Sequence, residues 1–393
     1  MKISTDKKKI DELLSRGVES VIDMTHLRKR LESGEKLRIK LGIDPTSPNL
    51  HLGRSIPLLK MRDFQELGHQ LVFIVGDFTG VIGDTSDKDS ERPMLGREQV
   101  QKNMKSYVEQ AGKIIDITKS EVQYNSTWLS SVNYNELGEQ ADAFSVAEFI
   151  ARDNIRRRLE AGTRVSLREV LYPLMQGYDS VAVKADVELG GTDQRFNLLA
   201  GRTLQERYGQ RPQDIIMNPL VAGTDGRKMS SSWGNTVNLN DAPHDMFGKI
   251  MSIPDSLIIP YFIYMTRVPM STVQQYETDM KTGQNPRDYK LKLASELVRF
   301  YHSEKDAQIA LDYFVATFAK KEIPTEIPEL KPSAYDIISV LQEARFATST
   351  SDARRTIEGG GVKINDKKVT SYEERCNPGD IIQKGKRFFV KIV

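Results

Sequence analysis

Cysteine, net charge and long apolar runs are all scarce in this sequence, and each shortage excludes a class of protein. The single cysteine, Cys376, cannot form an internal disulfide, and no Cys/His cluster offers a zinc site. The 56 basic and 54 acidic side chains give a net charge of +2, which is too small by itself to indicate a nucleic-acid partner. No apolar run reaches the roughly 18 residues of a membrane span, and the N-terminus lacks the apolar stretch of a signal peptide. We therefore expect a cytoplasmic protein with no membrane association and no bound structural metal.

Two widespread nucleotide-binding signatures are also missing. The chain contains neither a G-x-x-x-x-G-K-[ST] loop nor a G-x-G-x-x-G fingerprint. If an enzyme of this kind handles phosphates, it must hold them in another way.

What is present is an alternation of short apolar strands with amphipathic helices. The spacing predicts a helical segment over the first 35 residues, then strands at 37–43, 71–76, 122–124, 186–189 and 214–221 with helices between them. This order is typical of an α/β fold, a doubly wound parallel sheet of the Rossmann-like type with helices on both faces. Such sheets bind ligands beyond the carboxyl ends of their strands, so the loops after 43, 76 and 189 should carry the site.

The rest of the chain indicates further domains, as its 393 residues suggest. Only helical patterns occur between 240 and 320, three prolines mark a linker, and two short helices with small strands follow. The predicted organisation is an N-terminal helical segment (1–36), a catalytic domain (37–222, with a helical insertion around 130–170), a loop and helical domain (223–320), a linker (321–334) and a small α+β domain (335–393).

A first polar cluster, GIDPTSPNLHLGRS (42–55), joins a predicted strand to a helix. Free amide groups and the positive dipole end of the helix suit a phosphate, and Gly53 lets a flat group approach the backbone. His51 and Thr46 add directed hydrogen-bond donors for charge that develops on a phosphate. An ordinary strand–helix turn with His51 as a capping residue is an equally good interpretation of this segment alone.

A second cluster, GTDGRKMSSSWGN (223–235), is rich in glycine and hydroxyl groups and contains Lys228. Mobile loops of this kind can bring an ammonium group to a triphosphate. Taken alone, a solvated surface loop is the simpler interpretation.

Together the two clusters resemble the paired signatures of class I aminoacyl-tRNA synthetases, His-Ile-Gly-His and Lys-Met-Ser-Lys-Ser. Here they read His51-Leu-Gly-Arg54 and Lys228-Met-Ser-Ser-Ser232, in the same order. A polar helix face formed by Tyr172, Gln176 and Asp179, at i, i+4 and i+7, is flanked by apolar residues that indicate burial. With the segments 79–84 and 188–194, this face resembles the tyrosyl members of the class closely and the tryptophanyl members less well. The likeness extends from about 37 to 393.

The resemblance implies a role for each matching residue. The expected tyrosine-binding residues are Thr79, Asp84, Tyr172 and Gln176 for the ammonium group and Asp179 for the phenol hydroxyl. The residues expected to bind ATP or the adenylate are Gly42, Asp44, Gly53, Arg54, Asp193, Gln194, Ser230 and Ser231. The residues expected to stabilise the departing pyrophosphate, and thus to be catalytic, are Thr46, His51, Lys88, Arg92 and Lys228.

Three positions depart from the family pattern. Arg54 stands where the second histidine is usual, and Ser231 stands where the second lysine is usual. Many tyrosyl enzymes place a tyrosine, a partner for the phenol hydroxyl, where this chain has Lys40. Asp179 is then the main candidate for recognising the hydroxyl. Arginine at position 54 keeps a donor and adds a fixed charge, which is compatible with activity.

The tail (335–393) resembles the S4-like RNA-binding domain. Its basic edge, which would contact RNA phosphates rather than read bases, consists of Arg354, Arg355, Lys363, Lys367 and Lys368. A solvated basic face is the alternative, since the tail carries an excess of only three positive charges.

These features predict a tyrosine–tRNA ligase. Tyrosine and ATP, with Mg²⁺, would form tyrosyl-adenylate, and the tyrosyl group would pass to the 3′ end of tRNA(Tyr) without a covalent enzyme intermediate. The family is homodimeric, so a homodimer is implied. Two alternatives stay open at this point: a tryptophan-activating enzyme, and a non-catalytic RNA-binding paralogue, for which Arg54 is the only hint.

Overall fold

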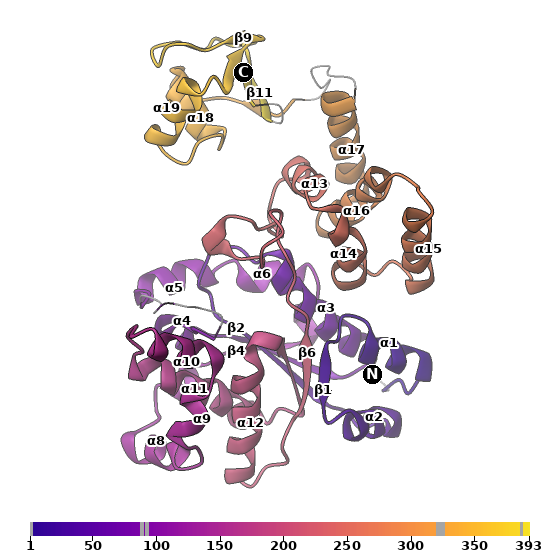
Figure 1. Ribbon diagram of the computed structural model, residues 1–393, viewed down its shortest axis with the longest axis vertical. Coiled ribbons are helices and arrows are strands. Elements are labelled where there is room, and N and C mark those ends of the chain that lie inside the picture. The colour runs from indigo at the N-terminus through magenta and orange to yellow at the C-terminus, as the bar shows by residue number, and fades with distance from the viewer. Residues whose placement is uncertain (1–2, 87–89, 91–93, 320–326, 386–387) are drawn as a thin grey trace. The chain divides into compact units, whose positions relative to one another are not determined.

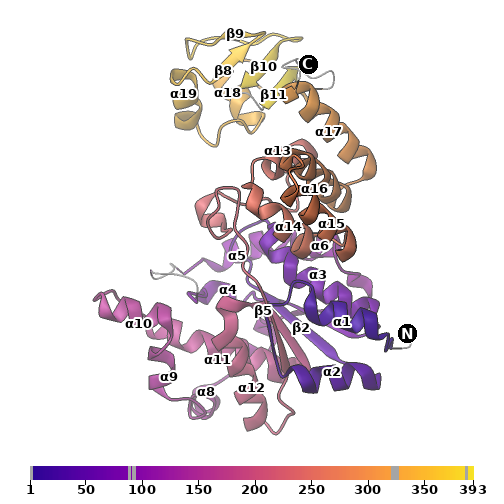
Figure 2. The same cartoon turned by 45° about the vertical axis from the view of Figure 1, so that its right-hand side comes forward.

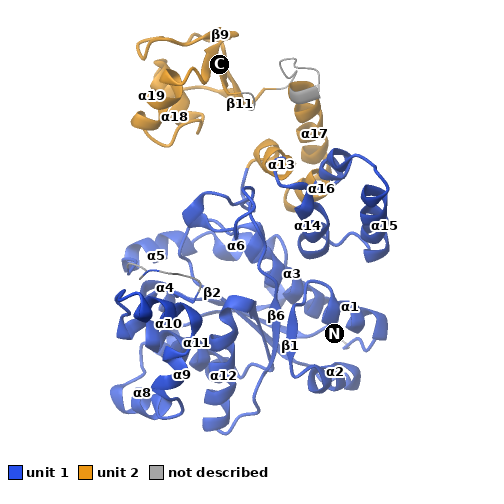
Figure 3. Cartoon of the chain, in the orientation of Figure 1, with its two compact units in different colours: residues 1–241, 252–293 blue, residues 242–251, 294–393 orange. Residues whose placement is uncertain are grey.

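The computed structural model describes residues 3–86, 90, 94–319, 327–385 and 388–393. Contacts divide the chain into two compact units (Figure 3). The first consists of residues 1–241 and 252–293, and the second of residues 242–251 and 294–393. Residues 223–241, predicted to begin the helical domain, thus belong to the first unit by their contacts.

A six-stranded sheet forms the centre of the first unit. Its strands are β1 (Ser20–Ile22), β2 (Arg38–Ile43), β3 (Gln70–Val75), β4 (Glu121–Tyr124), β5 (Val187–Gly191) and β6 (Asp214–Asn218), in the order β1-β6-β5-β2-β3-β4. Neighbouring strands are parallel except β1, which pairs antiparallel with β6. The run LVFIV in β3 is completely buried, as expected for a parallel strand covered on both faces. The predicted doubly wound α/β class is confirmed.

Helices cover both faces of this sheet. Helix α3 packs on β2, β3 and β5, whereas α11 and α12 pack together on the opposite face (Figures 1 and 2). The helices of this unit are α1 (Lys7–Ser15), α2 (Met24–Ser33), α3 (Leu52–Glu66), α4 (Thr79–Ile82), α5 (Arg97–Met104), α6 (Tyr107–Gly112), α7 (Ser126–Leu129), α8 (Tyr134–Ala141), α9 (Val146–Ile150), α10 (Asp153–Glu160), α11 (Leu167–Val183), α12 (Arg195–Arg207), α14 (Ile258–Met265) and α15 (Met270–Lys281). α16 (Pro286–Tyr301) contributes residues to both units.

The strand order creates a crevice between β2 and β5. The chain passes from β2 to β3 and β4 on one side, and β5 and β6 lie on the other side. The loops that leave β2 and β5 therefore diverge, and the carboxyl ends of these two strands are the usual place for a ligand.

One sequence prediction for this unit is wrong. The N-terminal segment was expected to be entirely helical, yet Ser20–Ile22 form strand β1. Val21 and Ile22 lie opposite Ile216 and Ile215 of β6. Their spacing also fits a helix, and only the distant edge strand decides in favour of the extended form. Between β3 and β4 the described chain forms three short α-helices, α4, α5 and α6.

The second unit contains α13 (Pro243–Met251), α17 (Glu304–Ala319) and a small α+β domain. In that domain α18 (Ile337–Glu343) and α19 (Thr350–Glu358) accompany a sheet of order β7-β11-β10-β8-β9. Its strands are β7 (Glu329–Leu330), β8 (Val362–Ile364), β9 (Lys367–Lys368), β10 (Ile381–Lys384) and β11 (Phe388–Ile392). Strand β7 lies in the predicted linker and pairs with β11, so the small domain begins earlier than the proline pattern indicated. The predicted helix pair and strands are present.

No single helix within the described ranges has the length and apolar character to cross a membrane. One bent pair, Pro243–Met251 with Asp255–Met265, meets those criteria jointly by length and composition.

Candidate active site

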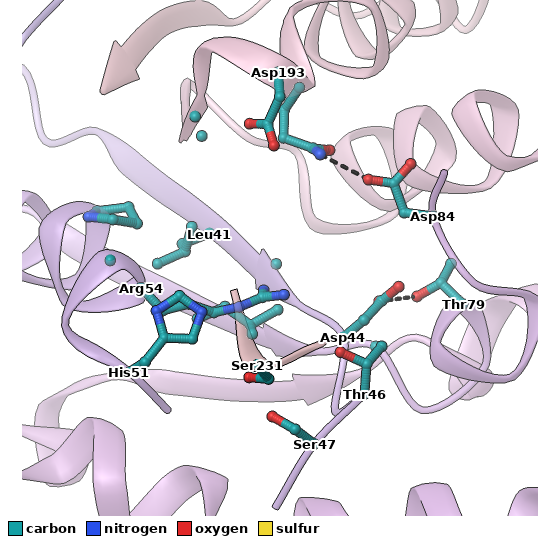
Figure 4. Close-up of a pocket in the computed structure, with 18 of the residues that line it drawn as sticks. Leu41, Asp44, Thr46, Ser47, His51, Arg54, Thr79, Asp84, Asp193 and Ser231 are labelled. Atoms are coloured by element: carbon teal, nitrogen blue, oxygen red, sulfur yellow. Dashed lines mark hydrogen bonds between the residues drawn. The ribbon is translucent and has the colours of Figure 1, made fainter. Parts of the chain in front are cut away.

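A cavity of about 570 Å³ opens at the carboxyl ends of β2 and β5, within the first unit. Its wall includes the loop after β2, the first turn of α3, the start of α4, one face of α11 and the loop 228–232. All the described residues predicted to bind tyrosine, ATP or pyrophosphate line this cavity (Figure 4 draws part of it). Lys88 and Arg92 lie outside the described residues.

His51 occupies the position just before helix α3, with extended backbone angles. It makes no side-chain capping bond, which excludes the simple capping role. His51 is half-buried, and its buried Nδ1 has no hydrogen-bond partner in the described part of the chain. Burial, followed by the positive charges of Arg54 and Lys228, lowers the pKa of His51 to about 3. The imidazole is therefore neutral at physiological pH and can direct one N–H without adding charge.

Two cations share the cavity with His51. Lys228 Nζ lies 3.0 Å from Asp193 Oδ2, which joins the second signature loop to the segment after β5. The side chain of Arg54, in the first turn of α3, has no hydrogen bond or ion pair among the residues that the structure describes. Its side chain extends toward the middle of the cavity in Figure 4, where Ser231 and Asp44 also lie. Both cations are thus placed to meet an anion.

Asp44 is the centre of a partly buried hydrogen-bond cluster. Its Oδ1 accepts from Thr79 Oγ1 at 2.7 Å, and its Oδ2 accepts from the Tyr172 hydroxyl at 2.8 Å. Burial raises the pKa of Asp44 to about 6. Gly76, at the end of β3, is needed here, because a Cβ at this position would collide with Asp44 Oδ1. Gly76 was not among the residues predicted from the sequence.

A second carboxylate, Asp84, faces the segment after β5. Gln194 Nε2 donates to Asp84 Oδ2 at 2.7 Å, and the Ser86 hydroxyl donates to Asp84 Oδ1 at 2.6 Å. Asn197 Nδ2 donates to Gln176 Oε1 at 3.1 Å. Asn197 Nδ2 also donates to Gln194 Oε1 at 3.0 Å. These bonds link Asp84 to Gln176 through Gln194 and Asn197 before any substrate arrives.

Asp179 is 3% exposed and accepts hydrogen bonds from two residues that the sequence analysis missed. Trp128 Nε1 donates to its Oδ1 at 2.8 Å, and Asn125 Nδ2 donates to its Oδ2 at 3.3 Å. Asn125 also donates to Thr79 Oγ1 at 2.8 Å, so it links two predicted tyrosine-binding residues. It follows β4 directly, and the rule that sites gather at the carboxyl ends of strands could have found it. Trp128 left no such signal.

Burial raises the pKa of Asp179 to about 7, against the opposing effects of Lys40, Trp128 and Asn125. Lys40 does not line the cavity; it is fully buried and forms an ion pair with Glu188.

Comparison with known proteins identifies the family to which this chain belongs. The family model for class I tRNA synthetases of the W and Y type matches residues 32–319, and the S4 domain model matches residues 337–382. The tyrosine–tRNA ligase of Thermotoga maritima is 44% identical over 97% of this chain and 96% of its own length. Tyrosine–tRNA ligase 2 of Pseudoalteromonas translucida is 46% identical over 96% of this chain and 97% of its own. The chain belongs to the tyrosyl-tRNA synthetase family.

Solved structures support the same fold for this tyrosyl-tRNA synthetase family member. A tyrosyl-tRNA synthetase from Archaeoglobus fulgidus complexed with L-tyrosine has a TM-score of 0.62 at 23% identity, over 77% of this chain and 99% of that one. A C-terminally truncated mitochondrial tyrosyl-tRNA synthetase from Aspergillus nidulans has a TM-score of 0.65 at 20% identity, over 77% and 92%. The predicted family, the predicted ligase function and the predicted S4-like tail are confirmed. The tryptophan alternative and the non-catalytic alternative are not favoured.

The five residues predicted to form a basic edge on the S4 domain lie on α19, β8 and β9. Arg354, Arg355, Lys367 and Lys368 are exposed, and Lys363 is half-buried. Acidic neighbours lie beside two of them: Lys363 Nζ is 2.8 Å from Asp366, and Arg355 is 3.5 Å from Asp352.

Proposed function

We propose that this chain activates tyrosine with ATP and transfers the tyrosyl group to the 3′ end of tRNA(Tyr), with each cavity residue in the role its position supports. The observation that carries the proposal is that one cavity unites the cations of both signature loops with the polar face of α11. A phosphate-handling group and an amino-acid-sized polar pocket in direct continuity are what adenylate formation requires, because catalysis here is positioning and charge stabilisation.

Tyrosine occupies the inner part of the cavity in this proposal. Asp84, Thr79, Tyr172 and Gln176 hold its ammonium group, and the Asp44 carboxylate fixes the hydroxyls of Thr79 and Tyr172 in place. Asp179 accepts a hydrogen bond from the phenol hydroxyl, while Trp128 and Asn125 orient the carboxylate.

ATP occupies the outer part. Gly42, Gly53, Asp193, Gln194, Ser230 and Ser231 line the place for the adenylate. Neutral His51, Thr46, Lys228 and Arg54 donate to the phosphates as charge passes to pyrophosphate, and Lys228 exchanges Asp193 for phosphate oxygens. The assignment of Lys88 and Arg92 to the same task rests on the sequence alone.

Mg²⁺ accompanies ATP as part of the substrate. Among the residues that the structure describes, no three His, Cys, Asp or Glu side chains are grouped to hold a metal ion. The ion would therefore be held mainly through the phosphates, as Mg²⁺ often is.

The S4 domain contacts tRNA through its basic edge, and the helical part of 223–320 contributes to tRNA binding. Because tRNA is the acceptor, we place the protein in the cytoplasm. The phosphate contacts position the tRNA without reading its sequence.

A homodimer forms, we propose, through an apolar surface on α8–α11. Large side chains exposed there are Tyr134 (92%), Val146 (71%), Ile150 (44%), Leu159 (45%) and Leu167 (73%). Five large apolar side chains exposed along one stretch of the chain favour this region as the contact between two copies. Light scattering should give the mass of two chains, and Val146→Asp should shift it toward one; a wild-type monomer would contradict the proposal.

Pyrophosphate exchange into ATP, measured separately with each of the twenty amino acids, tests the proposed activity. Exchange should occur with tyrosine only. Exchange with tryptophan, or none with any amino acid, would refute it.

A further inference from the structure

Lys40 and Glu188 form a buried cross-strand ion pair below the proposed tyrosine site. They lie opposite each other on the parallel strands β2 and β5, and Lys40 Nζ is 2.8 Å from Glu188 Oε1. The exposed fractions of the two side chains are 0% and 1%. Removing two charges from water costs free energy unless each has good hydrogen-bond partners, so this buried pair needs an explanation.

The partners of the pair belong to the helix that carries the tyrosine-binding face. The three N–H groups of Lys40 are matched by Glu188, the Gln176 carbonyl at 2.9 Å and the Ser180 hydroxyl at 2.7 Å. Gln176 Nε2 donates to Glu188 Oε1 at 3.3 Å, and Ser180 Oγ donates to Glu188 Oε2 at 3.1 Å. Gln213 Nε2 donates to the same Oε2. Lys40 and Glu188 thus both bond to Gln176 and Ser180 of α11.

The pair lies just outside the cavity. The cavity-lining residues of the two strands begin at Leu41 and Leu189, each one position beyond the pair. Helix α12 closes the other side at Gly201, where a Cβ would lie 2.6 Å from Gln213 Nε2 and 2.9 Å from Ser180 Oγ. Neither charge can therefore contact tyrosine directly.

We infer that the Lys40–Glu188 pair is a positioning device for tyrosine: it holds Gln176 in its ammonium-binding orientation and fixes the turn of α11 that carries Asp179. The inference rests on the proposed function. It assigns Lys40 a task other than bonding the phenol hydroxyl, and it assigns Glu188 a task for the first time.

Electrostatics supports this geometry. Lys40 opposes, and Glu188 assists, the rise in the pKa of Asp179 that burial causes. Removing Lys40 alone would leave the Glu188 carboxylate unpaired near Asp179 and disfavour the charged form of Asp179. Removing both charges would leave the pKa of Asp179 nearer to its value in the wild type.

The experiment compares Lys40→Met, Glu188→Gln and the double variant in tyrosine-dependent pyrophosphate exchange. Lys40→Met should raise the KM for tyrosine by about tenfold or more, the effect of losing a charged hydrogen-bond partner, while the KM for ATP stays within about twofold. The double variant should recover much of the loss, because no unpaired charge remains buried. Glu188→Gln alone should resemble Lys40→Met.

Lys60→Met is the matched control. Lys60 is 2% exposed, donates to the Leu13 carbonyl at 2.7 Å and pairs with Asp63, but it does not line the cavity. Its replacement should lower thermal stability and leave both KM values close to those of the wild type. If Lys40→Met changes the tyrosine and ATP constants by one common factor, as a general loss of stability would, the inference is wrong.

Two further outcomes are decisive. If Lys40→Met does not fold, Glu188→Gln carries the test, and a KM for tyrosine raised no more than that for ATP in this variant would overturn the inference. Wild-type protein without tyrosine-dependent exchange would refute the proposed function instead, so the two failures are distinguishable.

Discussion

The main effect of replacing Asp179 by asparagine should be a loss of discrimination between tyrosine and phenylalanine. The carboxylate accepts from Trp128 Nε1 and Asn125 Nδ2 and, in the proposed complex, from the phenol hydroxyl. In asparagine an amide nitrogen, which is a hydrogen-bond donor, replaces one of the two carboxylate oxygens. It would then face another donor. A hydrogen bond to a charged group contributes about 1.5–3 kcal/mol, which corresponds to a factor of about 10 to 150. Tyrosine kcat/KM should fall by that factor.

Phenylalanine supplies the internal control because it has no hydroxyl to lose. Its low kcat/KM should change much less, so the tyrosine-to-phenylalanine ratio should fall nearly as far as the tyrosine value. The assay is pyrophosphate exchange with both amino acids. If both values fell equally, Asp179 would act only on the structure of the pocket, and the hydroxyl would be recognised elsewhere.

The same carboxylate predicts a pH dependence. The pKa of Asp179 is about 7 rather than the usual 3.8, a preference of about 4 kcal/mol for the neutral form. Because the folded chain binds this proton more tightly than the unfolded chain, Asp179 makes the fold less stable as pH rises from about 4 to 7. It is ionised mainly above pH 7, so tyrosine kcat/KM should rise about tenfold between pH 6 and pH 8.

The pH profile of the ratio isolates Asp179 from its neighbours. Asp44 also titrates, near pH 6, but it acts on both amino acids. The charges that face Asp179 are Lys40 and Glu188, and neither borders the cavity. In Asp179→Asn the ratio should lose its dependence on pH between 6 and 8. A ratio that still rises with pH in this variant would refute the reasoning.

Three further predictions concern the phosphates and the tail. His51→Ala and Lys228→Ala should slow adenylate formation in single-turnover assays with little change in tyrosine affinity; weaker tyrosine binding in either variant would contradict this division. Arg54→His should cost less than His51→Ala in the same assay, since it keeps a donor, and an equal loss would make Arg54 essential. A chain ending at residue 319, before β7, should still make adenylate but charge tRNA poorly, with the salt slope of tRNA binding reduced by about 0.7–0.9 for each phosphate contact removed; full charging would exclude the tail from tRNA binding.

The sequence by itself determined the features that depend on neighbours along the chain. Buried parallel strands read as continuous apolar runs, and polar loops after 43, 76 and 189 mark one edge of the sheet. The i, i+4, i+7 spacing was enough to place Tyr172, Gln176 and Asp179 on one helix face, and that face does line the cavity. Two signature segments completed the identification of the family. All of these signals are local periodicities or short motifs.

Only the tertiary structure decided the features that depend on contacts between distant segments. Residues 20–22 fit a helix by spacing and became a strand because β6 offered an edge. Trp128 carries no local sign of its bond to Asp179, some fifty residues away. The place of Asn125 after β4 marks it as a candidate, but only the tertiary structure shows its bond to Asp179. In the sequence, Lys40 stands where many tyrosyl enzymes have a partner for the phenol hydroxyl. Its pairing with Glu188 depends on the register of β2 against β5. Strand register and side-chain hydrogen bonds between strands and helices are set by packing, which a single sequence does not display.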